Sequence, residues 1–100
     1  MNNFNIDITI RDVCCTKCCR SINESTVQIS DPDNLIPLQN CYSVHIIPSG
    51  DNRVLVIIQK GYFYIVRFAY TGVVTKICLP CCGTCCEHVL EIKVNSITTN

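Results

Sequence analysis

The chain opens with a strict alternation of apolar and polar residues. Phe4, Ile6, Ile8 and Ile10 are separated by single polar residues, and the same pattern returns at Leu90, Ile92 and Val94. A period of two places all the apolar side chains on one face of a β-strand. The sequence therefore predicts a strand from Phe4 to Ile10 and another over residues 90–94, each with one buried face.

The middle of the chain predicts strands of a different kind. Residues 54–59 are apolar as far as Gln59 and do not alternate, which is typical of a strand covered on both faces. Residues 62–70 alternate again, and we expect their aromatic side chains to lie in the core and in cross-strand pairs. Arg67 interrupts the second face of this strand, and we interpret it as a rim residue with a carboxylate partner. The residues on the first face are Tyr62, Tyr64, Val66, Phe68 and Tyr70.

Turn signals separate short strands along the rest of the chain. Residues 21–25 are mostly polar and predict a turn before a strand over 26–30, and further strands are expected over 35–38, 41–47 and 73–79. β-Branched and aromatic residues dominate, so we expect almost no helix. The predicted fold is all-β, a small antiparallel β-sandwich that is jelly-roll-like, with cysteine clusters in its connections. We expect a strand and cysteine-rich connector at 1–19 and the sandwich domain at 20–100.

Ten of the 100 residues are cysteines, and eight of them form two copies of the pattern Cys-Cys-x-x-Cys-Cys. Neighbouring Cα atoms are about 3.8 Å apart, below the usual disulfide span of roughly 4.4–6.8 Å, so adjacent cysteines pair only under strain. Adjacent side chains of an extended segment also point to opposite faces. Each doublet therefore suits a node that joins two different neighbours. The copies comprise Cys14, Cys15, Cys18 and Cys19, and then Cys81, Cys82, Cys85 and Cys86, with Cys41 and Cys78 outside them.

Charge and hydropathy exclude several classes of partner. The formal net charge is zero, without a basic face or tail, which argues against nucleic acid and anionic membranes. No apolar run reaches the roughly 20 residues of a membrane helix. The first residues also lack the basic start and apolar stretch of a secretory signal, so we expect synthesis in a reducing cytosol. There, a cysteine-rich pattern indicates bound metal, redox chemistry or thiols that oxidise later.

Metal binding is the main alternative. Cys15 and Cys18 form one Cys-x-x-Cys pair and Cys82 and Cys85 another, and two such pairs can build a tetrahedral Cys₄ zinc site. Some sixty residues separate the pairs, however, whereas compact zinc ribbons use 15–20. A thiol oxidoreductase is less favoured, because its Cys-x-x-Cys requires a helix amino terminus.

Catalysis has little support in the sequence. We interpret His45 and His88 as surface or capping histidines. No nucleophile, paired-carboxylate or phosphate-loop pattern is legible, so we do not expect an enzyme.

A short, strand-rich chain without a signal peptide, with cysteine doublets near its start and more cysteines near its end, resembles the endospore-appendage (ENA) pilins of Bacillus and its relatives. The resemblance implies a jelly-roll domain with an amino-terminal connector whose cysteines bond to subunits further along a fibre. Residues 1–19 would be the connector, and Cys78 to Cys86 would contain the acceptor thiols. It also implies synthesis in a mother cell and oxidation at the spore surface.

The favoured hypothesis is a structural, self-assembling subunit of a disulfide-crosslinked extracellular fibre or surface layer, of spore-appendage or coat type. All ten cysteines are candidates for intersubunit disulfides. The expected partner is a further copy of the chain, which receives the strand from Phe4 to Ile10 at a sheet edge. No cofactor is expected. The alternative is a cytoplasmic zinc module with Cys15, Cys18, Cys82 and Cys85 as ligands.

Overall fold

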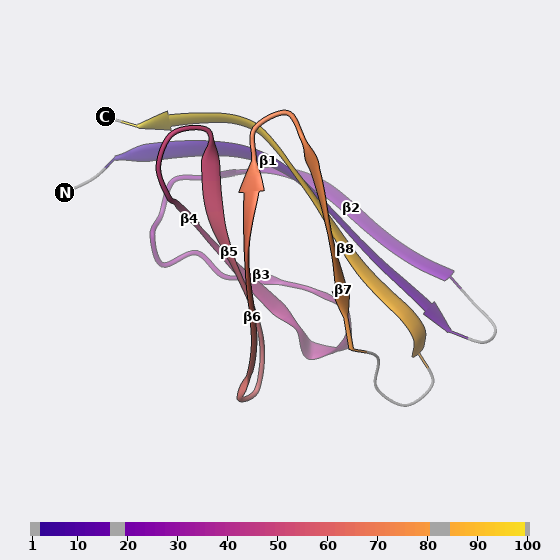
Figure 1. Ribbon diagram of the computed structural model, residues 1–100. Helices are drawn as coiled ribbons and strands as arrows, with labels where there is room; N and C mark the ends of the chain where they lie inside the picture. The colour runs from indigo at the N-terminus through magenta and orange to yellow at the C-terminus, as the bar shows by residue number, and fades with distance from the viewer. Residues whose placement is uncertain (1–2, 17–19, 81–84, 100) are drawn as a thin grey trace.

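Two four-stranded antiparallel sheets make up the described part of the chain (Figure 1). The computed structural model describes residues 3–16, 20–80 and 85–99, and of Thr16, Cys85 and Cys86 it describes only the backbone. Sheet A has the strand order β2-β1-β8-β7, and sheet B has the order β3-β4-β5-β6. The strands are β1 (Phe4–Thr16), β2 (Arg20–Ile29), β3 (Ile36–Pro37), β4 (Ser43–Pro48), β5 (Arg53–Lys60), β6 (Phe63–Tyr70), β7 (Val74–Leu79) and β8 (Cys85–Thr99). The predicted all-β fold is confirmed, and its jelly-roll character stays a prediction.

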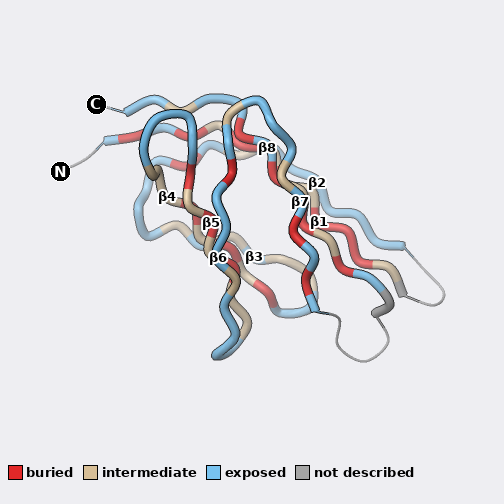
Figure 2. Tube along the Cα trace, in the orientation of Figure 1, coloured by how far each residue is buried: buried red, intermediate tan, exposed pale blue. Residues whose placement is uncertain are grey.

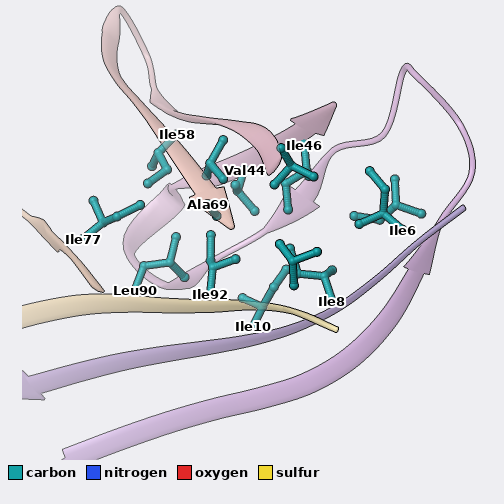
Figure 3. Close-up of a cluster of buried hydrophobic side chains, with 14 of the residues drawn as sticks. Ile6, Ile8, Ile10, Val44, Ile46, Ile58, Ala69, Ile77, Leu90 and Ile92 are labelled. Atoms are coloured by element: carbon teal, nitrogen blue, oxygen red, sulfur yellow. The ribbon is translucent and has the colours of Figure 1, made fainter. Parts of the chain in front are cut away.

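The core lies between the two sheets and is built from the alternating positions. Sheet A contributes residues such as Ile8 and Ile92, which are fully buried, and sheet B contributes Val44, Ile46 and Ile58 (Figure 3). A buried Ile or Val side chain contributes roughly 1.5–3 kcal/mol relative to an exposed one. The strands 4–10 and 90–94 therefore behave as their periodicity predicts.

Strand β1 is the centre of sheet A. It pairs with β2 from Ile6↔Ile29 to Cys15↔Arg20 on one side, and with β8 from Phe4↔Thr99 to Thr16↔Cys85 on the other. Both of its edges are therefore occupied within the chain. Donation of the strand from Phe4 to Ile10 to a neighbour would require these pairings to open first, and it stays a prediction, as does the connector at residues 1–19.

Strand β2 shows where local sequence misleads. The mostly polar residues 21–25 belong to this strand and not to a turn, because they pair with the second half of β1. They are exposed on both faces of an edge strand, so they need no apolar alternation. The cross-strand pairing outweighs the local turn propensity.

The helix content is as low as expected. Across the described residues the only helical element is a 3₁₀ turn, η1 (Gln39–Cys41), which precedes β4 where the sequence predicts the start of a strand. Within the same residues, no helix is long and apolar enough to cross a membrane.

Candidate functional site

Antiparallel pairing of the longest strands brings the described cysteines of both clusters to one end of sheet A. Strand β1 ends where β8 begins, with Cys14 opposite His88 and Thr16 opposite Cys85. Strand β7 ends at the same place, since Cys78 pairs with Val89. Figure 1 shows this end of β1, β7 and β8 at the far side of the molecule from both termini. Two segments some seventy residues apart in the chain thus form one thiol-bearing end.

The first doublet sends its two thiols in opposite directions, as predicted for an extended pair. Cys14 lies on the inner face of β1 and is 5% exposed, whereas Cys15 lies on the outer face and is half-buried. Cys78 is exposed on that same outer face. It pairs with Val89, which pairs in turn with Val13, and Val13 shares a face with Cys15 because the two lie two residues apart in β1. A shallow hollow of about 400 Å³ lies beside Cys15. Its lining residues are Val13, Cys15, Arg20, Lys76, Glu87, Val89 and Glu91.

The inner thiol belongs to a polar network built around a buried pair, His88 and Asp12. His88 is 1% exposed and Asp12 is 2% exposed. His88 Nε2 donates to Asp12 Oδ1 at 2.5 Å, which leaves Nδ1 as the acceptor on the other side of the ring. The Asn40 amide nitrogen lies 3.5 Å from that Nδ1 and 3.3 Å from Cys14 Sγ, within hydrogen-bond distance of both atoms. The side chains form a chain of contacts from Asp12 through His88 and Asn40 to Cys14.

The 3₁₀ turn η1 contributes the remaining hydrogen bonds of this network. The backbone N–H of Gln39 donates to Asp12 Oδ2 at 2.7 Å, and its side-chain amide donates to the carbonyls of Asp12 and Ser21. Asn40 follows in the left-handed region, with φ 59° and ψ 35°, a conformation that asparagine tolerates better than most residues. Both carboxylate oxygens of Asp12 are therefore satisfied, as a buried carboxylate requires.

Packing around His88 adds to its confinement. The ring of Tyr42 meets the His88 ring edge-on at a centroid distance of 5.4 Å, and the Tyr42 hydroxyl donates to the carbonyl of Pro80 at 2.9 Å. The interpretation of His88 as a surface histidine is therefore wrong. His45, in contrast, is partly exposed, and its Nε2 contacts the carbonyl of Pro32 at 2.6 Å.

A signal for this network was present in the sequence. Asp12 and Cys14 continue the inward-facing series Phe4, Ile6, Ile8, Ile10 at the same period of two, and His88 begins the series Leu90, Ile92, Val94. A polar residue at an inward position predicts a buried partner. The identity of that partner depended on the pairing of β1 with β8, which the sequence did not specify.

The described cysteines differ in accessibility. Cys41 and Cys78 are exposed, Cys15 is half-buried, and Cys14 is buried. For Cys85 and Cys86 the structure gives only a position in β8, and the remaining candidates Cys18, Cys19, Cys81 and Cys82 lie outside the described residues. Of the four cysteines predicted as zinc ligands, Cys15 is therefore the one with a described side chain. Among described residues, no group of three or more His, Cys, Asp or Glu is arranged to hold a metal ion.

The aromatic face of β6 is a second departure from expectation. Strand β6 is the edge of sheet B, and Tyr64, Phe68 and Tyr70 are 58%, 42% and 45% exposed. Figure 2 shows most of this strand as exposed. The prediction that these side chains fill the core is wrong, because the opposite face of the strand, with Ala69, points inward.

Arg67 is exposed, as a rim residue should be, and a carboxylate partner for it on a neighbouring subunit stays a prediction. Its guanidinium donates to the carbonyl of Val66 at 2.9 Å, and no carboxylate of the described residues pairs with it.

Comparisons with protein-family models, with curated proteins and with solved structures found no match to this chain.

Proposed function

We propose that this chain is a structural subunit that assembles with further copies of itself into a disulfide-crosslinked fibre or surface layer, of the spore-appendage or coat type, outside the cell. The observation that carries the proposal is the accessible thiols at one end of sheet A. Cys15 and Cys78 share the outer face, and Cys41 is exposed beside the same end. A thiol must be accessible to exchange with a disulfide of another chain.

The strand directions of sheet A support side-by-side addition of copies. Strands β2 and β7 are the two edges of the sheet, and neither outer edge pairs with another strand of the described residues. An antiparallel sheet with four strands has edges that run in opposite directions. A copy displaced sideways without rotation therefore offers its β2 to β7 in the antiparallel sense, and the two thiol-bearing ends stay level.

Charges on the outer face of sheet A favour one register for this contact. Glu24, Arg11, Glu91 and Lys76 lie in one row across β2, β1, β8 and β7, with alternating signs. Arg11 lies 3.2 Å from Glu91 and 3.9 Å from Glu24. Lys76, at the β7 edge, has no ion pair within the described residues. A sideways copy in the same register sets its Glu24 opposite Lys76 and continues the alternation.

The outer face of sheet B supports the same function. In sheet B, Leu55 pairs with Phe68 and Ile57 with Val66, and all four point away from the core. Phe68 and Val66 are 42% and 49% exposed, and Arg53 lies over the Phe68 ring at 4.7 Å. An exposed apolar patch that includes an aromatic ring and an arginine is typical of a protein–protein interface.

The covalent part of the proposal is tested by oxidising the purified, reduced chain with glutathione disulfide and comparing gels with and without reductant. We expect a ladder of oligomers that collapses to the 11.2 kDa monomer when reduced. Mass spectrometry of the ladder should find disulfides between chains that include Cys15, Cys41 or Cys78. A monomer in both lanes, or disulfides confined to single chains, would contradict the proposal.

The register is tested by two opposite charge reversals. Lys76→Glu alone places a second carboxylate opposite Glu24, and Glu24→Lys alone sets two lysines together, so each variant should assemble poorly. An equimolar mixture restores an opposite pair wherever the two variants alternate and should assemble again. Relative to an attractive pair, like charges cost about 1–2 kcal/mol, or roughly 5- to 30-fold in the association constant at low salt. Lys93→Glu, an exposed reversal on the inner strand β8, is the matched control and should assemble like the parent chain.

A zinc module is the second candidate, and one observation favours it. The pairing of Thr16 with Cys85 removes the sequence separation that argued against a shared site for the two Cys-x-x-Cys pairs. Zinc would then hold Cys15 together with ligands from the second cluster. Metal analysis of protein purified anaerobically decides between the crosslinked subunit and the zinc module. The zinc module would be favoured by one zinc ion per chain together with four thiols that stay unreactive until a chelator is added.

A further inference from the structure

We infer that Asp12, Asn40 and His88 withhold Cys14 from disulfide exchange, so that Cys15 is the member of the doublet that reacts first. This inference rests on the proposed crosslinking function and assigns the order in which the thiols of the doublet are used. Asp12, Asn40 and His88 are positioning residues in this account, since the reacting atoms are the sulfurs.

The two sulfurs of the doublet meet different surroundings. Cys15 borders the hollow on the outer face, where an oxidant or a second chain can reach it. Cys14 is 5% exposed and lies between the sheets, opposite the fully buried ring of His88. In thiol–disulfide exchange the attacking sulfur must contact a sulfur of the disulfide directly. A buried thiol therefore reacts only when the residues that cover it move away.

The cover over Cys14 is η1, and several contacts hold it in place. The Asn40 amide lies 3.3 Å from Cys14 Sγ. Its position depends on the left-handed backbone at Asn40 and on Gln39, which is bonded to both the carboxylate and the carbonyl of Asp12. His88 is hydrogen-bonded on one side to Asp12, and its Nδ1 lies 3.5 Å from the Asn40 amide nitrogen. Exposure of Cys14 therefore requires η1 to leave β1, which breaks these contacts together.

The chemical steps are ordinary thiol–disulfide exchange. The Cys15 thiolate attacks one sulfur of a low-molecular-weight disulfide such as glutathione disulfide, and the other half leaves as a thiolate. A thiolate from a second chain then attacks Cys15 in the mixed disulfide and releases the remaining half, which leaves one interchain disulfide. Two electrons pass in total from the two protein thiols to the small disulfide, and Cys14 takes no part while η1 is closed.

The test measures alkylation rates of single cysteines in the reduced, full-length chain. A timed pulse of iodoacetamide is quenched, the protein is unfolded, and the remaining thiols are capped with N-ethylmaleimide. Trypsin cuts after Arg11 and Lys17, so Cys14 and Cys15 share one short peptide that contains no other cysteine, and fragmentation between them assigns each label. We expect Cys14 to react at least about tenfold more slowly than Cys15 and Cys78.

The substitution Asn40→Gly tests the cover itself. Glycine accepts the left-handed backbone, so the change removes the amide without backbone strain. We expect the Cys14 rate to rise about fivefold or more, while the Cys15 and Cys78 rates stay within about twofold. Asn52→Gly is the matched control, because Asn52 has the same left-handed backbone, with φ 63°, in the exposed turn before β5. It should leave all rates unchanged.

A merely structural role for Asn40 would show in a different readout. Hydrogen exchange at the buried core of β8, measured on the same samples, reports global opening, and we expect Asn40→Gly to leave it nearly unchanged. The inference is overturned if Cys14 and Cys15 react equally fast in the parent chain. It is also overturned if Asn40→Gly does not accelerate Cys14, or does so only in parallel with core exchange. Since the reduced monomer is measured, these results are independent of whether the oxidised chain forms a ladder.

Discussion

Replacing Asp12 by alanine removes a buried carboxylate that connects β1 to both His88 and η1. The change leaves two donors without this acceptor, the buried His88 Nε2–H and the part-buried backbone N–H of Gln39. Hydrogen bonds to a charged group are worth about 1.5–3 kcal/mol each. Because two such bonds are lost, we expect Asp12→Ala to lower the free energy of unfolding by about 3–5 kcal/mol.

This loss is large for a chain of 100 residues, whose total stability is expected to be about 5–15 kcal/mol. Urea unfolding of the reduced monomer, followed by far-UV circular dichroism, measures it directly. With a slope of about 1.5 kcal/mol per molar urea, the midpoint should fall by roughly 2–3 M. Asp51→Ala, in the exposed turn between β4 and β5, is the matched control and should shift stability by less than about 0.5 kcal/mol.

A double-mutant cycle separates the pair from its surroundings. If Asp12 and His88 stabilise one another, Asp12→Ala with His88→Ala should cost at least about 1 kcal/mol less than the sum of the single changes. A loss below about 1 kcal/mol for Asp12→Ala, or strictly additive losses, would refute the reasoning, because neither is compatible with a buried carboxylate that satisfies both donors.

Three further substitutions test other parts of the structure. Ile92→Ala, at a fully buried core position, should lower the unfolding free energy by about 2–5 kcal/mol in the same urea assay, and a loss below about 1 kcal/mol would mean that the sheets do not pack there. Tyr42→Phe removes the hydroxyl that donates to Pro80 and should cost about 0.5–1.5 kcal/mol, with no change in the slope of the urea transition. Val66→Lys, on the exposed outer face of β6, should leave monomer stability within about 0.5 kcal/mol and weaken self-association in sedimentation velocity, and unchanged association would remove that face from the proposed interface.

Much of the fold was legible in the sequence because strand periodicity is a local property. The alternation of Ile6, Ile8 and Ile10, and of Leu90, Ile92 and Val94, selects one face for burial whatever the strand pairs with. The opposite directions of Cys14 and Cys15 follow from the same geometry, since adjacent residues of any extended segment point to opposite faces. Residues that obey a two-residue period can therefore be oriented before their partners are known.

What the tertiary structure alone decided is which strand lies beside which. Pairing of β1 with β8 joins Asp12 to His88 across 76 positions of the chain and collects the cysteine clusters at one end, and no local pattern contains that choice. The same holds for β6, whose aromatic residues have the alternation of a buried strand but lie at a sheet edge with one face open. Side-chain periodicity fixes the direction in which a residue points, whereas burial and chemistry depend on the neighbours that sheet order brings to that side.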